Sequence, residues 1–113
     1  MNYEELQAYM AGKVFLIGLT FLDPADEVIE KYQTHGTVEA LTDAQVFEFR
    51  LQDGSLFRLP FDPETIIQAP PADYREHSTG QVIHHPDFIT TWEIQVGPGL
   101  STDLIKQQGF VIT

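Results

Sequence analysis

The chain has 113 residues, a length typical of one domain, and it contains no cysteine, which excludes disulfides, thiolate metal sites and cysteine nucleophiles. Seventeen acidic residues against six basic ones give a formal net charge of -11. This charge argues against nucleic acid or an anionic membrane as partner, because both are bound through positive charge. With 42% hydrophobic residues, the composition is that of a folded globular protein.

The chain begins with a short helix, predicted over residues 2–11. Asn2 is a suitable N-cap and Gly12 a suitable end, and the apolar residues between them fall at helical spacing. The start is acidic where a secretory signal would be basic, and the longest apolar run, residues 14–22, is too short to cross a membrane as a helix. We therefore expect a cytoplasmic protein without a membrane partner.

Residues 14–22 form the strongest predicted strand. Apolar side chains alternate onto both of its faces, so the strand should lie centrally in a sheet and be covered on both sides, on one of them by the helix. A turn at residues 23–26 leads to a long, polar strand over residues 28–40. Gly36 interrupts this strand and predicts a bulge that bends it, as a small barrel needs at a corner.

A hairpin is predicted next, with strands at residues 46–51 and 56–60. A three-residue loop places Phe49 opposite Phe57, whereas a two-residue loop would place a charged residue opposite Phe49. Only the first register keeps the aromatic rings on one face and the charges on the other, so burial selects it. Gly54 then supplies the positive φ that a type I turn with a bulge requires.

The second half of the chain predicts short elements separated by proline and glycine. An Asp-Pro pair is typical of the start of a helical turn, and alternating residues before a Gly-Pro-Gly segment predict a strand. The predicted elements are a helical turn at 62–66, a loop at 69–79, a strand at 81–84, a turn at 85–87, a strand at 88–96, a terminator at 97–99, a helix at 102–108 begun by Ser101 and ended by Gly109, and an edge strand or packed tail at 110–112.

Together these elements predict a mainly β protein in a single domain, residues 1–113. The N-terminal helix takes residues 1–12, the strands take residues 13–97, and a short helix and tail take residues 98–113. Hairpin-length links favour a small antiparallel SH3-like barrel or a strongly curled sheet with short flanking helices. An α+β open sheet with the N-terminal helix on one face is the alternative.

One segment, residues 69–94, has the sequence APPADYREHSTGQVIHHPDFITTWEI. It resembles a pattern in a family of short bacterial proteins of unassigned function: Pro-Pro or Pro-Gly, then Tyr-Arg, Ser-Thr-Gly, and Pro-Asp-Phe before a tryptophan strand. Residues 16–20 and the pair His35-Gly36 are similar to the front of that pattern. The resemblance implies a bacterial source and one small domain, and it brings no catalytic residues with it.

Four histidines, His35, His77, His84 and His85, raise the question of a metal site. Zinc or iron is held by two or three histidines with a carboxylate, and Asp87 lies nearby in sequence. The spacings match no metal-binding motif, and neighbours on a strand face opposite ways unless the following turn twists them together. The pattern favours histidines in turns or on the surface, and we expect no metal and no cofactor.

A proline-bearing loop carries the other candidate binding residues. An Arg75–carboxylate bridge and a Tyr74 ring packed on Pro71 would explain this pair structurally, and contact with a ligand is the alternative. Residues 78–80, Ser-Thr-Gly beside His77, favour a β-turn with hydroxyl bonds over an activated nucleophile. The predicted binding residues are Tyr74, Arg75, His77, His84 and His85, and no catalytic residue is assigned.

Two functions of different classes follow. The first is a non-enzymatic, acidic protein-binding module of immunity or adaptor type, whose partner is a protein with a basic surface or a second copy of the chain. The alternative is a small metal-dependent hydrolase using His77, His84, His85 and Asp87. A local cluster of acids, interpreted as a solvated turn and strand edge, consists of Asp23, Asp26, Glu27 and Glu30.

Overall fold

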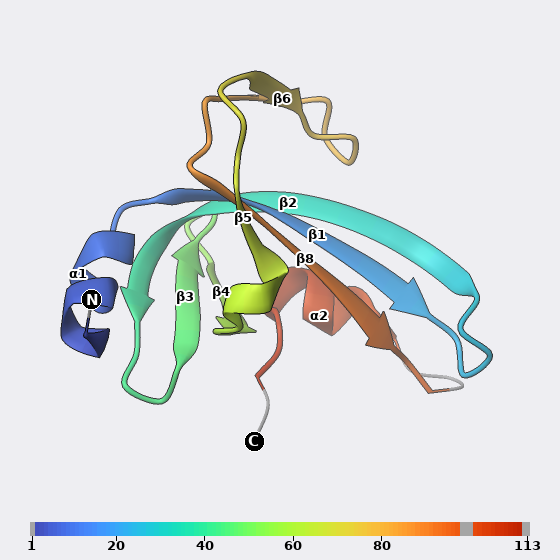
Figure 1. Cartoon of the computed structure of the whole chain (residues 1–113). Helices are drawn as coiled ribbons and strands as arrows, with labels where there is room; N and C mark the ends of the chain where they lie inside the picture. The colour runs from blue at the N-terminus through green and yellow to red at the C-terminus, as the bar shows by residue number, and fades with distance from the viewer. Residues whose placement is uncertain (1, 98–100, 112–113) are drawn as a thin grey trace.

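The computed structural model describes residues 2–97 and 101–111, and a strongly curved six-stranded sheet organises them (Figure 1). The strands lie in the order β4-β3-β2-β1-β8-β5, and β6 and β7 form a second, two-stranded sheet. The mainly β expectation is confirmed. In chain order, the elements are α1 (Tyr3–Met10), β1 (Val14–Leu22), β2 (Val28–Leu41), β3 (Val46–Arg50), β4 (Leu56–Pro60), the 3-10 turn η1 (Pro63–Thr65), β5 (Ile66–Gln68), β6 (Asp73–Arg75), β7 (Val82–His84), β8 (Phe88–Gln95) and α2 (Asp103–Gln108).

Strand β1 is central, as predicted, with β2 on one side and β8 on the other. Its alternate residues Phe15, Ile17, Leu19 and Phe21 are buried in the core. The pairing with β2 is antiparallel, but the pairing with β8 is parallel, so the expectation of a wholly antiparallel sheet is wrong. A parallel neighbour needs a long connection. Alternation within single strands carries no information about such a distant partner.

The sheet curls, but it does not close into a barrel in the described residues, because β4 and β5 remain its two edges. Gly109 and Phe110 contact β4 instead: the Phe110 N–H donates to the Arg58 carbonyl at 2.8 Å, and Gly109 forms an isolated bridge with Arg58. Helix α2, which precedes these two residues, lies on the inner side of the curve (Figure 1). Of the predicted architectures, the structure is the curled sheet and not the closed SH3-like barrel.

The core lies on the concave side of the sheet and is rich in phenylalanine. Phe15 of β1 contacts Phe47 and Phe49 of β3, with ring centroids 5.3 and 5.2 Å apart. Burial of one such side chain stabilises the fold by about 2 kcal/mol before the entropy cost is subtracted. This aromatic cluster therefore joins strands that are not neighbours in the sheet.

The β3–β4 hairpin has the predicted register. Phe49 pairs with Phe57. In the loop, the Leu51 N–H donates to the Ser55 carbonyl at 3.0 Å, and Gly54 has a φ of +85°. The three-residue loop chosen from burial is confirmed.

The bend in β2 is placed differently from the prediction. The register against β3 shifts between Val38 and Ala40, and not at Gly36. Gly36 is required for another reason: a Cβ there would lie 3.1 Å from the Arg50 carbonyl oxygen and 3.1 Å from the Cβ of Phe49. The absence of a side chain lets β3 approach closely.

Helix α1 begins with the predicted cap, since the Asn2 side chain accepts from the Glu5 N–H at 2.8 Å. Helix α2 begins one residue later than predicted: its N-cap is Thr102, and Ser101 Oγ accepts from the Asp103 N–H at 3.2 Å. Gly109, with a φ of +72°, ends α2. Among the residues described, neither helix is long and apolar enough to span a membrane.

Two further predictions concern residues 69–79 and the end of the chain. The predicted loop over residues 69–79 contains strand β6, so that part of the prediction is wrong. Residues 98–100, which include most of the predicted terminator, and residue 112 of the predicted tail lie outside the described residues.

Candidate functional site

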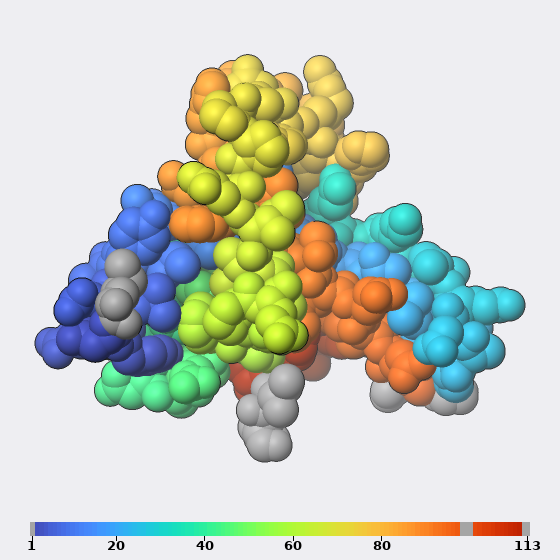
Figure 2. Space-filling model, in the orientation of Figure 1, coloured from blue at the N-terminus to red at the C-terminus, as the bar shows by residue number. Residues whose placement is uncertain are grey.

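The convex side of the sheet carries the β6–β7 hairpin, which stands above the curved body as a lobe (Figure 2). Its strands pair antiparallel, with Tyr74 opposite Ile83. This hairpin faces the outer side of β1. Helix α1, which was expected to cover one of the two faces of β1, packs at one end of the sheet, against β2. The reason is the short link between α1 and β1, in which the Gly12 N–H donates to the Val38 carbonyl of β2 at 2.9 Å.

A buried pair of polar side chains joins the hairpin to the sheet. His35 Nδ1 of β2 lies 2.7 Å from Glu76 Oε2, and the two side chains are only 11% and 5% exposed. The second carboxylate oxygen of Glu76 accepts from the Thr79 hydroxyl at 2.9 Å. Both oxygens of this buried carboxylate are thus hydrogen-bonded, as the desolvation cost of a carboxylate requires.

A second tie runs from Gln33 of β2 to the tip of the hairpin. Gln33 Oε1 accepts from the His77 N–H at 2.9 Å, and the Gln33 N–H donates to Ser78 Oγ at 3.2 Å. The predicted turn is present but covers residues 77–79, one residue earlier than expected, and the Thr79 hydroxyl also accepts from the Gln81 N–H at 3.2 Å. The Ser78 hydroxyl therefore joins the lobe to the sheet, whereas the Thr79 hydroxyl forms its bonds within the hairpin.

Between the hairpin and the sheet lies a groove of about 250 Å³, which we call the hairpin groove. Leu16 and Gly18 of β1 and Ile89 and Thr91 of β8 line it from the sheet. From the hairpin side it is lined by Tyr74, Arg75, Glu76 and His77. Three of the five predicted binding residues therefore share one groove.

The Tyr74–Arg75 pair is held by carbonyl oxygens and not by a carboxylate. The Tyr74 hydroxyl donates to the Pro70 carbonyl at 2.9 Å, and Arg75 Nη1 donates to the Gly80 carbonyl at 3.0 Å. Arg75 forms no ion pair with any described residue, so the expected Arg–carboxylate bridge is absent from that part of the chain.

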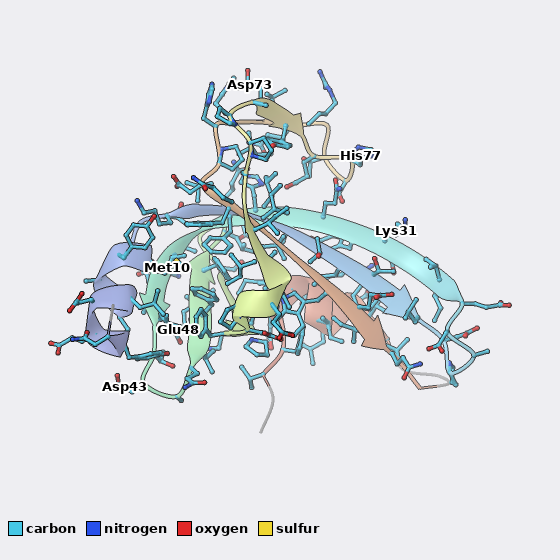
Figure 3. All side chains as sticks on the ribbon, viewed as in Figure 1. Met10, Lys31, Asp43, Glu48, Asp73 and His77 are labelled. Carbon is cyan, nitrogen blue, oxygen red and sulfur yellow. The ribbon has the colours of Figure 1, made fainter. Side chains whose placement is uncertain are left out.

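The other two predicted binding residues lie away from the groove. His84 Nδ1 is 3.0 Å from Asp73 Oδ1, and His85 Nε2 is 3.9 Å from the same oxygen. A left-handed backbone at His85, with a φ of +46°, turns the two adjacent rings toward one carboxylate. All three side chains are at least half exposed. Asp73 and His77 lie at different ends of the lobe (Figure 3).

The residues of the metal-dependent alternative are not brought together. Asp87 Oδ2 accepts from the Val14 N–H at 2.8 Å, which joins the start of β8 to the start of β1. His77 lies at the hairpin tip, apart from His84 and His85. Among the described residues, no group of three histidines and carboxylates could hold a metal ion.

A second surface is the outer edge of β2 (Figure 1). Strand β2 pairs with β1 along most of its length, but β3 pairs only with its last five residues, Thr37 to Leu41. The unpaired part begins at Val28 and Ile29, whose side chains are 55% and 56% exposed. It follows directly on the acidic turn that contains Asp23, Asp26 and Glu27.

The acidic cluster divides into two parts. Asp23 Oδ1 accepts from the N–H groups of Ala25 and Glu27 at 2.8 and 3.0 Å, and this confirms the turn. Glu30 instead receives hydrogen bonds from Lys106 Nζ at 2.7 Å and from the Thr102 hydroxyl at 2.9 Å. The bond from Lys106, followed by that from Thr102, lowers the pKa of the Glu30 carboxyl below its ordinary value.

The sequence did not point to three residues that build this region: Glu76, Gln33 and Gly18. Glu76 and Gln33 are polar residues in polar segments, and only the folded arrangement shows that one is buried and that the other holds a loop. Gly18 did carry a signal, because glycine is unusual in the middle of a central strand.

No model of a known protein family matches the chain, and comparisons with curated proteins and with solved structures found no significant match. The resemblance to a family of short bacterial proteins therefore stays a prediction.

Proposed function

We propose that the protein is a non-enzymatic binding module that docks an extended, basic segment of a partner protein. The proposed surface, called the docking edge, consists of residues 28–32 of β2 and of the acidic turn residues Asp23, Asp26 and Glu27. The observation that carries the proposal is that, among residues 2–97 and 101–111, β2 has a sheet partner on only one side before Thr37.

The backbone of the docking edge supports strand addition. The Gln33 N–H points away from β1, since it donates to Ser78 Oγ. In an antiparallel strand, residues two apart direct their N–H and C=O groups to the same side, so Lys31 also directs its groups outward. An extended peptide can use such groups as a new sheet neighbour, with exposed side chains adding contacts. Val28 and Ile29 supply the apolar part of this surface.

Charge favours a basic partner over a second copy of the chain. The net charge is -11, and of the six basic residues Arg50, Arg58 and Lys106 are already bonded to carboxylates. A basic segment would be attracted to the acidic turn, and complementary charge accelerates encounter. A second copy would bring its own acidic turn, and the lysine at position 31 also guards the edge against self-pairing. An immunity-type or adaptor role is compatible with such a module.

A synthetic peptide of alternating lysine and valine tests the docking edge. We expect it to bind, measured by calorimetry, and we expect a version with alternate amides N-methylated to lose binding, because it cannot form the sheet hydrogen bonds. Lys31→Pro should have the same effect, since proline removes the outward N–H and is tolerated at a sheet edge. Equal binding of the methylated peptide would refute strand addition.

The contribution of the acidic turn to peptide binding can be tested with a matched control. Asp26→Asn with Glu27→Gln removes two charges at the docking edge, and Glu4→Gln with Glu5→Gln removes two charges in α1, at a separate part of the fold. We expect weaker peptide binding and a smaller salt dependence for the first pair only. Equal losses for both pairs would show that net charge, and not the docking edge, attracts the peptide.

A further inference from the structure

Strand β2 continues past the docking edge, but the tip of the β6–β7 hairpin covers its next outward backbone group. The tip consists of the turn residues 77–79. The Gln33 N–H donates to Ser78 Oγ at 3.2 Å, and Gln33 Oε1 accepts from the His77 N–H at 2.9 Å. Figure 3 shows His77 at the end of the lobe nearest to Lys31. The open edge therefore stops directly before Gln33.

The tip and an added strand compete for the same place. A strand that pairs with β2 lies about 4.8 Å from it and offers carbonyl oxygens to its outward N–H groups. At Gln33 such an oxygen would have to take the position of Ser78 Oγ. A segment bound only at residues 28–32 leaves the tip in place, whereas a segment that continues to Gln33 must displace it.

The contacts that hold the tip are few and polar. Residues 77–79 are all exposed, so no buried apolar surface retains them. Among the described residues, their hydrogen bonds to the sheet are the two that involve Gln33. A segment with so few buried contacts opens locally at a low cost in free energy. An added strand would also supply a new acceptor for the Gln33 N–H, so that group is not left unbonded.

The rest of the hairpin has a separate attachment. Glu76 contacts His35 through side chains, 2.7 Å apart and almost entirely buried. Strand pairing at the edge uses backbone groups instead, so it does not compete with this contact. The tip can therefore leave the edge while Glu76 keeps the hairpin on the sheet.

We infer that the hairpin tip is a displaceable cap on the docking edge. A basic segment long enough to reach Gln33 removes Ser78 from its N–H and pairs there, and the next outward residue, His35, becomes available before β3 begins to pair at Thr37. The inference rests on the strand addition proposed above and adds a selection by length: a short segment leaves the cap closed, and a longer one opens it.

Hydrogen exchange at single amides tests the cap, with lysine–valine peptides of about four and about eight residues. The short peptide should slow exchange at Lys31 only. The long peptide should slow exchange at Lys31 and Gln33 and accelerate it at His77, because the His77 N–H loses its acceptor. The long peptide gains further pairs only in this direction, since the chain turns at residues 23–26 before β2.

Two negative results have different meanings. If neither peptide slows exchange at Lys31, the docking edge is refuted and the cap with it. If both peptides protect Lys31 while exchange at Gln33 and His77 stays unchanged, the cap is refuted and the docking edge stands.

Variants of the cap should change affinity for the long peptide alone. Ser78→Ala removes the acceptor that the peptide must displace, so calorimetry should show long-peptide binding about two- to tenfold tighter and short-peptide binding unchanged. Gln33→Ala releases the His77 N–H but keeps the backbone of β2, and it should act in the same direction. Ser101→Ala is the matched control, because it removes a hydroxyl that accepts from the Asp103 N–H at α2, and it should change neither affinity. Unchanged long-peptide affinity in Ser78→Ala and Gln33→Ala would refute the cap.

Discussion

At the scale of single residues, the most consequential contact joins two side chains that are distant in sequence. His35 lies on β2 and Glu76 follows β6, and their 2.7 Å contact is almost entirely buried. A buried carboxylate is tolerated only where its oxygens find donors. The pair therefore explains why a hairpin with few apolar residues stays in a defined position above the sheet.

Removal of one member of this pair should be costly. In Glu76→Ala, His35 would remain buried without its hydrogen-bond partner, and we expect the free energy of unfolding to fall by about 1 to 3 kcal/mol. Glu76→Gln keeps an acceptor oxygen and should cost less. Urea unfolding measures both, and hydrogen exchange of the β6–β7 amides should increase in the alanine variant. Identical stability of the two variants would show that the hydrogen bond contributes little.

Gly18 and Gly36, the two glycines within strands β1 and β2, provide a second test at this scale, on the free energy of unfolding. In Gly36→Ala the new methyl would press on the backbone of Arg50 at 3.1 Å, and we expect a loss of about 1 to 3 kcal/mol from the strain. In Gly18→Ala the methyl enters open space beside Thr91, so stability should be unchanged or slightly higher. Thermal or urea unfolding compares the two directly. A larger loss for Gly18→Ala would contradict the difference in space that the structure shows beside these two glycines.

At the scale of elements, locally determined features could be predicted and remotely determined ones could not. The β3–β4 register follows from alternation and one glycine within fifteen residues, and it is correct. Strand β6 has three residues. Its position depends on contacts with residues of β2, which lie about 40 positions away in the sequence. The parallel pairing of β1 with β8 likewise depends on a distant partner. Tyr74, Arg75 and His77 could be chosen from the sequence, whereas Glu76 and Gln33 could not.

Attachment of α2 to the sheet should depend on pH. Hydrogen bonding to Glu30 raises the pKa of Lys106, while the pKa of Glu30 is lowered, chiefly by the bond from Lys106. The contribution of Glu30 is therefore complete above the ordinary carboxyl pKa and is lost as pH falls through the lowered value. The contribution of Lys106 is complete below the ordinary lysine pKa and is lost as pH rises through the raised value.

Trp92 can report this change, since it is the only tryptophan and its ring packs edge-on against Phe110, which follows α2, at 5.3 Å. We expect its fluorescence to change in acid and again at alkaline pH, with a plateau between. Glu30→Gln should remove the acid transition and leave Trp92 in its loosened state throughout. An unchanged acid transition in that variant would show that another carboxylate controls it.

At the scale of the whole molecule, the negative charge acts in two opposite ways. A net charge of -11 on a small domain repels itself in the folded state, which is more compact than the unfolded chain. The same charge attracts a basic partner to the docking edge. Composition indicated the basic partner, but only the structure shows where the unpaired edge lies next to the acidic turn.

Salt should therefore move stability and partner binding in opposite directions. At about 0.15 M salt the screening length falls to about 8 Å, so repulsion among distant carboxylates weakens and urea unfolding should show a higher free energy than at about 0.01 M. The exposed ion pairs lose some stabilisation at the same time, but each is worth at most about 1 kcal/mol. Over the same range, binding of the lysine–valine peptide should weaken. Asp26→Asn with Glu27→Gln should reduce both slopes, because it removes charge that contributes to each. If added salt lowers the free energy of unfolding, the ion pairs outweigh the repulsion. The acidic surface then stabilises the fold through its ion pairs more than it attracts a basic partner.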